Sequence, residues 1–218
     1  MAEYSHQSTN INWSLVKDDW VESWKNYWKP CDIGKNFIVL PSWIELPDNS
    51  QSKNVIKIDP GAAFGTGSHP STYLCLREME DIKIKSKKVL DIGCGSGILL
   101  IAAKILGATN LHAIDNDYLA INSTEQNFKL NFKELKGLNL YEGYFQEITL
   151  NKSFKDFDLI TCNILANVIK LIIPDIFNSL KFGGQVILSG ILSSQKEDII
   201  KLLNLNYFSI DNVLSEKD

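Results

Sequence analysis

The pattern of apolar and polar residues changes near residue 87. Beyond that point, short apolar runs such as KKVLDIG and FDLITCN alternate with longer segments in which apolar residues recur at helical spacing. The short runs are typical of buried strands, and the longer segments are typical of the helices that connect them. Strands joined by helical crossovers predict an α/β fold with a mostly parallel, twisted sheet and helices on both faces.

The individual elements are expected where these runs begin and end. Strands of the sheet are expected at residues 87–93, 110–115, 138–143, 157–163, 183–190 and 207–214, and helices at residues 97–107, 118–131, 168–180 and 194–204. Upstream of the sheet, the sequence predicts short strands at residues 35–41 and 54–59, a turn at residues 47–52 and a helix at residues 70–80.

An aromatic stripe marks the first part of the chain. Residues 13–29 have a helical pattern that ends at Pro30, and Trp20, Trp24 and Trp28 fall on one face of this helix. Because aromatic stripes are usually buried, we interpret this one as the packing face of a linker helix. A peptide-binding face is the alternative.

Composition narrows the functional classes. The 218 residues are 44% hydrophobic and carry a net charge of −4, which disfavours nonspecific nucleic-acid binding and permits a basic protein partner. No apolar run reaches the ~18 residues of a membrane span, and the polar N-terminus lacks the apolar core of a signal peptide. The four cysteines lie far apart without a C-x-x-C pair, so we expect no metal site, no disulfides and a reducing cytoplasm.

A glycine-rich turn follows the first strand of the expected sheet, in the stretch VLDIGCGSG at residues 89–97. Gly93, Gly95 and Gly97 form a turn without side chains, so a ligand can approach its backbone and the free N–H groups of the helix start. Asp115 ends the next strand, 22 residues after Gly93, where a carboxylate can accept both ribose hydroxyl protons of an adenosine. A nucleoside site is therefore predicted at the carboxyl edge of the sheet.

The spacing of the glycines separates two kinds of ligand. The dinucleotide pattern G-x-G-x-x-G requires a third glycine at position 98, where this chain has Ile98. The observed G-x-G-x-G, preceded by Asp91, favours a nucleoside without a pyrophosphate, and S-adenosylmethionine is the leading candidate. A turn that binds nothing is one alternative. A nicotinamide-dependent dehydrogenase is another, disfavoured by Ile98.

A second glycine-rich stretch, IDPGAAFGTGSHPST at residues 58–72, lies just upstream. DPGAAFGTGSHPSTYLCL, DIGCGSGILLIAAKILGA, CNILANVI and LKFGGQVILSGIL together resemble the ribosomal protein L11 methyltransferase family, and the match runs from about Trp20 to the C-terminus. The resemblance implies a class I, Rossmann-like methyltransferase that uses S-adenosylmethionine. Its substrates would be lysine side chains and the α-amine of a ribosomal protein of the large-subunit stalk base. We further expect a cytoplasmic monomer that binds neither nucleic acid nor membranes directly.

The resemblance also implies the roles of individual residues. Asp115 matches the ribose ligand of the family, and Asn163 matches the asparagine that opens N-I-L-A. The carbonyl oxygen of such an asparagine can accept a hydrogen bond from an incoming amine and orient its lone pair, so Asn163 is the expected catalytic residue. The expected cofactor contacts are Thr72, Gly93, Gly95, Asp115 and Asn163, with Phe64 and Thr66 from the loop at residues 64–69 that covers the methionine end.

Other residues and the chain limits give further expectations. His69 is either a general base or, in our interpretation, the residue that holds the loop, and we interpret Cys94 and Cys162 as core residues rather than nucleophiles. The family's N-terminal recognition domain and last strand are expected to be absent. The alternatives are therefore an amine methyltransferase for another protein or a small molecule, or a cofactor-binding module inactive through truncation. We expect a tail over residues 1–12, a linker helix with short strands over 13–56, and a catalytic domain over 57–218.

Overall fold

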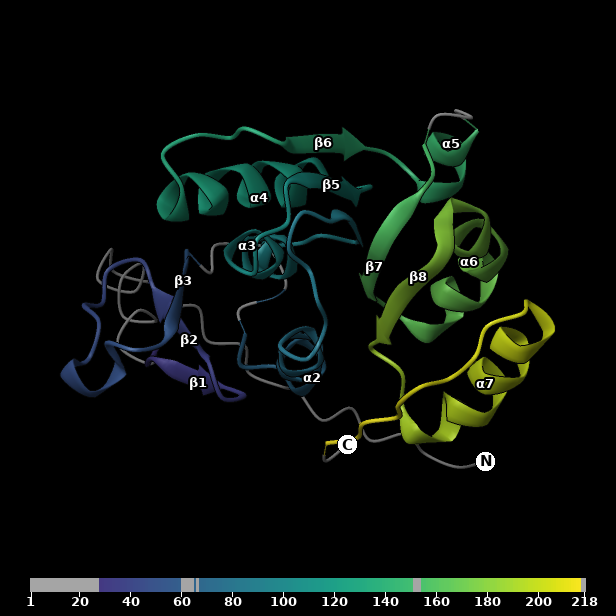
Figure 1. Ribbon diagram of the computed structural model, residues 1–218, viewed down its shortest axis with the longest axis horizontal. Helices are drawn as coiled ribbons and strands as arrows, with labels where there is room; N and C mark the ends of the chain where they lie inside the picture. Colours follow the sequence, from purple (N-terminus) through teal and green to yellow (C-terminus); the bar gives the residue numbers. More distant parts are fainter. Residues whose placement is uncertain (1–27, 60–64, 66, 151–153, 217–218) are drawn as a thin grey trace, which may run out of the picture.

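The computed structural model describes residues 28–59, 65, 67–150 and 154–216, which build two separate sheets (Figure 1). The larger sheet has five strands in the order β6-β5-β4-β7-β8, and every neighbouring pair is parallel. Its strands are β4 (Lys88–Ile92), β5 (Asn110–Asp115), β6 (Leu138–Glu142), β7 (Phe157–Asn163) and β8 (Leu180–Ser189).

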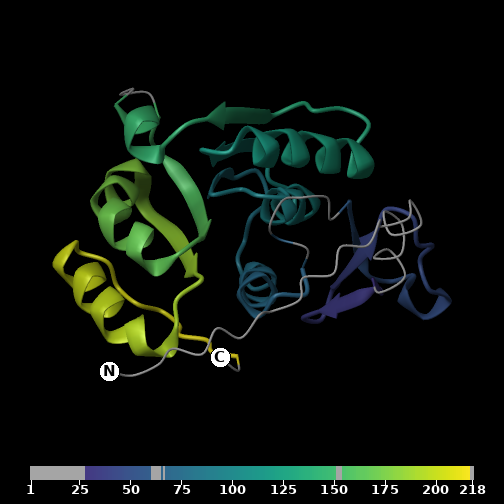
Figure 2. The same ribbon diagram turned by 180° about the vertical axis from the view of Figure 1, so that it is seen from behind.

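Helices cover both faces of this sheet, as the two opposite views show (Figures 1 and 2). Neighbouring strand residues such as Val89 and Leu90 belong to different clusters of buried residues, because successive side chains point to opposite faces. The predicted α/β fold with a mostly parallel sheet is therefore confirmed. None of the helices in the described ranges has both the length and the apolarity to cross a membrane. One face carries α2 (Pro70–Met79), α3 (Ile98–Ile105) and α4 (Tyr118–Asn131); the other carries α5 (Phe145–Thr149), α6 (Ala166–Ser179) and α7 (Lys196–Leu205).

Most predicted elements coincide with observed ones, and β5, α4 and β7 begin and end at the predicted residues. Strand β8 begins three residues earlier than predicted, because Leu180 pairs with Phe157 next to an irregularity between Phe157 and Leu159. The short helix α5 was not predicted, because five residues are too few to show a helical period. The described residues also contain two single turns of 3₁₀ helix, η2 (Asp48–Ser50) within the predicted turn and η3 (Ser193–Gln195) before α7.

The strand predicted at residues 207–214 is wrong. This segment forms neither strand nor helix. Phe208 packs edge-on against Phe177 of α6, with ring centroids 5.5 Å apart, and the Asn212 Nδ2 donates a hydrogen bond of 3.2 Å to the Glu78 Oε2 of α2. Phe208 thus contributes to helix packing, whereas Tyr207, Ile210 and Val213 are exposed, and the segment forms no strand pairing.

The smaller sheet packs against the same core as the larger one. It consists of β1 (Cys31–Ile33), β2 (Phe37–Pro41) and β3 (Asn54–Ile58), with β2 antiparallel to β1 and parallel to β3. Buried Phe37 and Ile56 lie in one cluster with Leu76 of α2 and Leu99 of α3. The strands predicted at residues 35–41 and 54–59 are confirmed, whereas β1 was not predicted.

The tail over 1–12 and the predicted helix over 13–29, with Trp20 and Trp24, fall outside the described residues except for residues 28 and 29.

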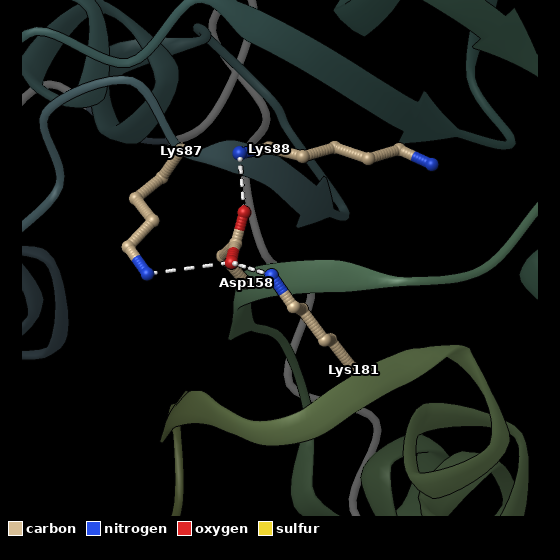
Figure 3. A network of polar contacts seen from close by, with 4 residues as sticks. All are labelled: Lys87, Lys88, Asp158 and Lys181. Carbon is tan, nitrogen blue, oxygen red and sulfur yellow. Dashed lines mark hydrogen bonds and ion pairs between the residues drawn. The ribbon is translucent and has the colours of Figure 1, made fainter.

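The amino edge of the larger sheet is fastened by one carboxylate (Figure 3). Asp158, near the start of β7, accepts a hydrogen bond of 2.9 Å from the Lys88 N–H of β4. Its Oδ1 also forms ion pairs of 3.3 Å with Lys87 and with Lys181 of β8. Burial opposes ionisation of this carboxyl group, but the Lys88 N–H and the two ammonium groups lower its pKa. Three strands are therefore aligned at this edge, and their opposite, carboxyl ends lie together.

Candidate functional site

The glycine turn after β4 is held against the neighbouring strand. The Gly93 and Cys94 N–H groups both donate to the Ile114 carbonyl of β5, at 2.8 and 3.1 Å. Gly93 has a φ of +71°, and a Cβ added there would lie 2.3 Å from the Ile164 Cγ2. Both the backbone conformation and the close approach of Ile164 therefore require glycine at this position. Because Ile164 follows Asn163 directly, this contact also brings the turn beside the end of β7.

Asp115 lies at the end of β5, beside the same turn. Its Oδ2 accepts a hydrogen bond of 3.1 Å from the Gly95 N–H, and its Oδ1 accepts one of 3.1 Å from the Asp117 N–H. A carboxylate has about four acceptor positions, so two remain after these contacts. Asp115 is only partly buried and can offer them to a ligand. The structure thus brings together two of the residues that the sequence predicts, Gly95 and Asp115.

A second carboxylate, Asp91, is buried beneath the turn and was not among the predicted site residues. Thr161 Oγ1 donates a hydrogen bond of 2.7 Å to its Oδ1, whereas its Oδ2 has no partner among the described residues. Burial raises the pKa of Asp91 to about 8; the Thr161 hydrogen bond opposes this rise, and the charge of Asp115 adds to it. Its position as the acid of D-x-G-x-G was the sequence signal that could have identified it.

Thr72 and Asn163 meet at the carboxyl edge although they are 91 residues apart. The Asn163 Nδ2 donates a hydrogen bond of 3.2 Å to the Oγ1 of Thr72, which is fully buried in the first turn of α2. The register pairs Asn163 with Ser189 of β8, and the Ser189 Oγ donates a hydrogen bond of 3.0 Å to the Ser71 carbonyl. The start of α2 is therefore fixed across the ends of β7 and β8. With Nδ2 engaged, Oδ1 is the amide atom of Asn163 that can accept a further donor.

His69 caps the same helix. Its Nδ1 accepts a hydrogen bond of 3.3 Å from the Ser71 N–H and lies 2.7 Å from the Ser71 Oγ. Side-chain capping of a free N–H group stabilises the first turn of a helix. This geometry agrees with the interpretation of His69 as the residue that holds the loop.

The two glycine-rich stretches touch each other through Ser96. The Ser96 hydroxyl, which is fully buried, donates a hydrogen bond to the Gly65 carbonyl. Gly65 has a φ of +100°, and a Cβ added there would lie 2.9 Å from the Ser96 Oγ, so the close approach requires glycine. Phe64 and Thr66, its neighbours in the chain and predicted cofactor contacts, lie outside the described residues.

The buried thiols near the site are poor nucleophiles. Burial raises the pKa of Cys75 to about 12 and raises the pKa of Cys94 and Cys162 as well, with the Asp91 charge contributing to each rise. Because the thiolate is the reactive form, these values agree with the interpretation of Cys94 and Cys162 as core residues.

The chemistry of these groups fits S-adenosylmethionine. Asp115 offers acceptors for ribose hydroxyl groups, and Asp91 offers a buried acceptor without a partner among the described residues. The side chains described at this edge carry no positive charge, which suits a ligand with a cationic sulfur and an ammonium group and disfavours a pyrophosphate. The connected contacts place Thr72, Gly93, Asp115 and Asn163 at one edge of the sheet.

Comparison with known sequences gives one consistent result. The family model described as ribosomal protein L11 methyltransferase (PrmA) matches residues 1–218. A ribosomal protein L11 methyltransferase of Prochlorococcus marinus strain MIT 9515 is 56% identical over 214 residues, which cover 98% of this chain and 71% of the relative. One of Synechococcus elongatus is 38% identical over 202 residues, which cover 91% of this chain and 66% of the relative.

Solved structures agree with this result. A ribosomal protein L11 methylase of Lactobacillus delbrueckii subsp. bulgaricus superposes with a TM-score of 0.78 and 32% identity, covering 87% of this chain and 94% of that one. A precorrin-6y C5,15-methyltransferase of Geobacter metallireducens has a TM-score of 0.52 and 18% identity, covering 62% of this chain and 69% of that one. The second likeness concerns the fold alone. Together they confirm the Rossmann-like fold.

Proposed function

The chain belongs to the ribosomal protein L11 methyltransferase family, and on this premise we propose that it methylates amino groups of ribosomal protein L11. The family resemblance predicted from the four sequence stretches is confirmed. Because this family uses S-adenosylmethionine, the predicted cofactor is confirmed as the cofactor of the family. The acceptors that we propose are lysine side chains and the α-amine.

The proposal rests on how two contacts join the ends of the strands. The hydrogen bond between Thr72 and Asn163, together with the contact between Gly93 and Ile164, joins the expected acceptor-binding asparagine to the expected nucleoside turn. An amine held by Asn163 would therefore lie beside the ligand of that turn. Direct transfer between two bound molecules needs mainly such positioning.

We propose the following contacts for the cofactor. Asp115 accepts the ribose hydroxyl groups, the glycine turn with Gly93 and Gly95 supports the nucleoside, and Thr72 lies where the methionine part would bind. When bound, S-adenosylmethionine supplies a methyl group on a positively charged sulfur atom. Burial raises the pKa of Asp91 to about 8, so this carboxyl group is mostly neutral at pH 7, and its Oδ2, without a partner among the described residues, adds a polar group beneath the turn. Phe64 and Thr66 stay proposed contacts on the strength of the family resemblance.

Asn163 is the residue that we propose for catalysis. Its Nδ2 is held by Thr72, so its Oδ1 can accept a hydrogen bond from the incoming amine and aim the nitrogen lone pair. The amine must be neutral to react, whereas a free lysine has a pKa of about 10.4. Desolvation beside the apolar side chains of Ile164 and Leu165 would favour the neutral form.

The remaining features of the proposal concern the partner and the setting. The substrate, ribosomal protein L11, belongs to the stalk base of the large subunit, which places the reaction in the cytoplasm. We propose that the enzyme acts as a monomer and does not contact nucleic acid directly, in keeping with its net charge of −4. Residues 57–218 would form the catalytic domain, and residues 13–56 the linker region.

A transfer assay with radiolabelled methyl groups tests the proposal. Purified L11 is compared with a mixed cell extract, and binding of S-adenosylhomocysteine is measured by calorimetry in parallel. Label on purified L11 together with cofactor binding supports the proposal. Label only on other components of the extract favours an amine methyltransferase for another substrate, and binding without any label favours an inactive cofactor-binding module.

A further inference from the structure

A buried asparagine on α4 joins two segments that are far apart in the sequence. The Asn127 side chain is 1% exposed, and its Oδ1 accepts a hydrogen bond of 2.8 Å from the Asp59 N–H, just after β3. Its Nδ2 donates one of 2.9 Å to the Ser96 carbonyl in the glycine turn, and the Asp59 carbonyl lies 3.4 Å away as a further acceptor. One side chain thus links the small sheet to the turn.

A second asparagine, one helical turn later, makes only half of this connection. The Asn131 Oδ1 accepts a hydrogen bond of 2.8 Å from the Lys57 N–H, and its Nδ2 donates one of 2.7 Å to the Lys57 carbonyl. Asn127 and Asn131 are four residues apart on the helix, which corresponds to a rise of about 6 Å, and their partners Asp59 and Lys57 are two residues apart, which in a strand corresponds to about 6.7 Å. The two asparagines are therefore spaced to reach every second residue of an extended segment. Asn127 and Asn131 therefore bind the edge of β3 that lies opposite β2.

Only the first of the two asparagines reaches the site. Ser96, whose carbonyl Asn127 binds, also donates its hydroxyl hydrogen to the Gly65 carbonyl. One turn earlier on α4, the Thr124 Oγ1 donates a hydrogen bond of 3.1 Å to the Gly95 carbonyl. Two successive carbonyl groups of the glycine turn are thus held by α4, the helix that follows Asp115.

These contacts fix the orientation of the peptide planes in the turn. Because a trans peptide is planar, a carbonyl held toward α4 forces the N–H group of the same peptide to point away from that helix. The orientation of these peptides sets the shape of the turn and which of its backbone groups face a ligand. The N–H of the peptide after Ser96 donates a hydrogen bond of 2.8 Å to the Cys94 carbonyl, so Asn127 and Cys94 restrain the two ends of the same peptide. Loss of the Asn127 contact would remove one of these two restraints and loosen Ser96, whose hydroxyl binds the Gly65 carbonyl.

We propose that Asn127 is a positioning residue of the cofactor site, because its amide holds the glycine turn and the end of β3 together. The proposal rests on the function proposed above, since that function assigns the turn to S-adenosylmethionine. Asn127 acts through the backbone of Ser96 and need not touch the ligand. Asn131 holds β3 in the same way but leaves the turn alone.

Two alanine variants separate these roles. Asn127→Ala and Asn131→Ala each remove one pair of contacts to β3, so both are expected to lower the melting temperature. Calorimetric titration with S-adenosylhomocysteine should show binding weakened about tenfold or more for Asn127→Ala and less than about threefold for Asn131→Ala. In turnover assays, the loss in Asn127→Ala should fall mainly on the KM for S-adenosylmethionine.

A second pair of variants covers the case in which Asn127→Ala does not fold. In Asn127→Asp, a side chain of the same size still accepts the Asp59 N–H and loses the donations of Nδ2, of which the one to Ser96 is the shortest. The matched control is Asn131→Asp, which keeps the acceptor for the Lys57 N–H. Equal affinities for the two members of a pair, or wild-type affinity in both Asn127 variants, would overturn the proposal.

Hydrogen exchange separates a failure of this proposal from a failure of the proposed function. If the wild-type protein does not bind S-adenosylhomocysteine, the proposed function is wrong, and the amide exchange of residues 93–97 still tests the role of Asn127. Exchange in that turn should be faster in the Asn127 variants than in the Asn131 variants. Equal rates would contradict the positioning role.

Discussion

Asp115 and Asn163 each make protein contacts that fix their orientation and still leave acceptor capacity. The Asp115 carboxylate is held by the Gly95 and Asp117 N–H groups, and the Asn163 amide is held by Thr72. Side chains that are oriented before a ligand arrives lose less freedom on binding. The two residues should therefore contribute to different quantities, Asp115 to cofactor affinity and Asn163 to the rate.

Replacement of Asp115 should weaken cofactor binding strongly. In Asp115→Ala, both ribose contacts and the hydrogen bond to Gly95 are lost, and hydrogen bonds to a charged group are worth about 1.5–3 kcal/mol each. Two such contacts correspond to about 3–6 kcal/mol, so we expect the Kd for S-adenosylhomocysteine to rise roughly 100-fold or more in calorimetric titration. Asp117→Asn is the control, because Asp117 caps α4 and can still do so as asparagine. Unchanged affinity in Asp115→Ala would refute the ribose role.

Replacement of Asn163 should act on the chemical step. Asn163→Ala removes the proposed acceptor for the amine and should lower kcat about 100-fold, in line with the loss of a positioning contact. Because Asn163 is also an expected cofactor contact, the Kd for S-adenosylhomocysteine should rise as well, but by a smaller factor than kcat falls. Thr72→Val, which frees the Asn163 amide and also removes a proposed cofactor contact, should lower kcat by a smaller factor and raise the KM for S-adenosylmethionine. A variant Asn163→Ala with wild-type kcat would remove Asn163 from the mechanism.

At the scale of elements, the amino edge of the sheet depends on one carboxylate shared by β4, β7 and β8. Asp158 has a lowered pKa, so its contribution to stability is present above the ordinary aspartate pKa and is lost as pH falls through the lowered value. We expect Asp158→Asn to reduce the free energy of unfolding by a few tenths to about 1 kcal/mol at pH 7, since this group is partly screened by solvent.

The pH dependence distinguishes this contribution from a packing defect. In urea titrations, the difference between Asp158→Asn and wild type should become smaller near pH 3, where the wild-type carboxyl group is increasingly protonated. Asp156→Asn is the matched control, because Asp156 is exposed, forms no ion pair with a described residue and has a φ of +64° that asparagine tolerates. A difference that stays constant with pH would contradict the electrostatic assignment.

The elements also show which parts of the fold the sequence could predict. β5, α4 and β7 were located to the residue, because each run ends at a polar residue, Asp115, Asn131 and Asn163. Residues 207–214 also have a strand-like pattern of apolar residues, but they pair with no strand. Phe208 packs against Phe177 of α6, and a contact between such distant residues leaves no signal in the local sequence. For the site, Asp115 and Asn163 could be predicted because they end strands. Asp91 could have been predicted from its place as the acid of D-x-G-x-G, although its burial and its unpartnered Oδ2 among the described residues could not. Asn127 could not be predicted, because its role depends on backbone partners from distant segments.

At the scale of the whole molecule, the two sheets share one core. Phe37 and Ile56 of the small sheet and Leu76 and Leu99 beside the large sheet belong to the same buried cluster. Asn127 and Asn131 add polar contacts across the same boundary. Burial of about 25 cal/mol per Å² of apolar surface makes separation of the two sheets costly. Residues 28–59 should therefore not unfold independently of the large sheet.

Hydrogen exchange with increasing urea tests this cooperativity. Amides of β2 and β3 should become exposed at the same urea concentration as amides of β4 and β7, because the shared core opens in one step. Asn131→Ala should lower both midpoints together. Exposure of the small sheet at a distinctly lower urea concentration would show that it is a separate folding unit.

The central claim, that this chain methylates ribosomal protein L11, is tested most directly by the intact mass of that substrate. Purified L11 is incubated with S-adenosylmethionine and either the wild-type chain or Asn163→Ala. With the wild-type chain, the mass of L11 should increase by whole methyl additions, and with Asn163→Ala the increase should be much slower. An unchanged mass of L11, from a folded wild-type chain that binds S-adenosylhomocysteine, would contradict the account.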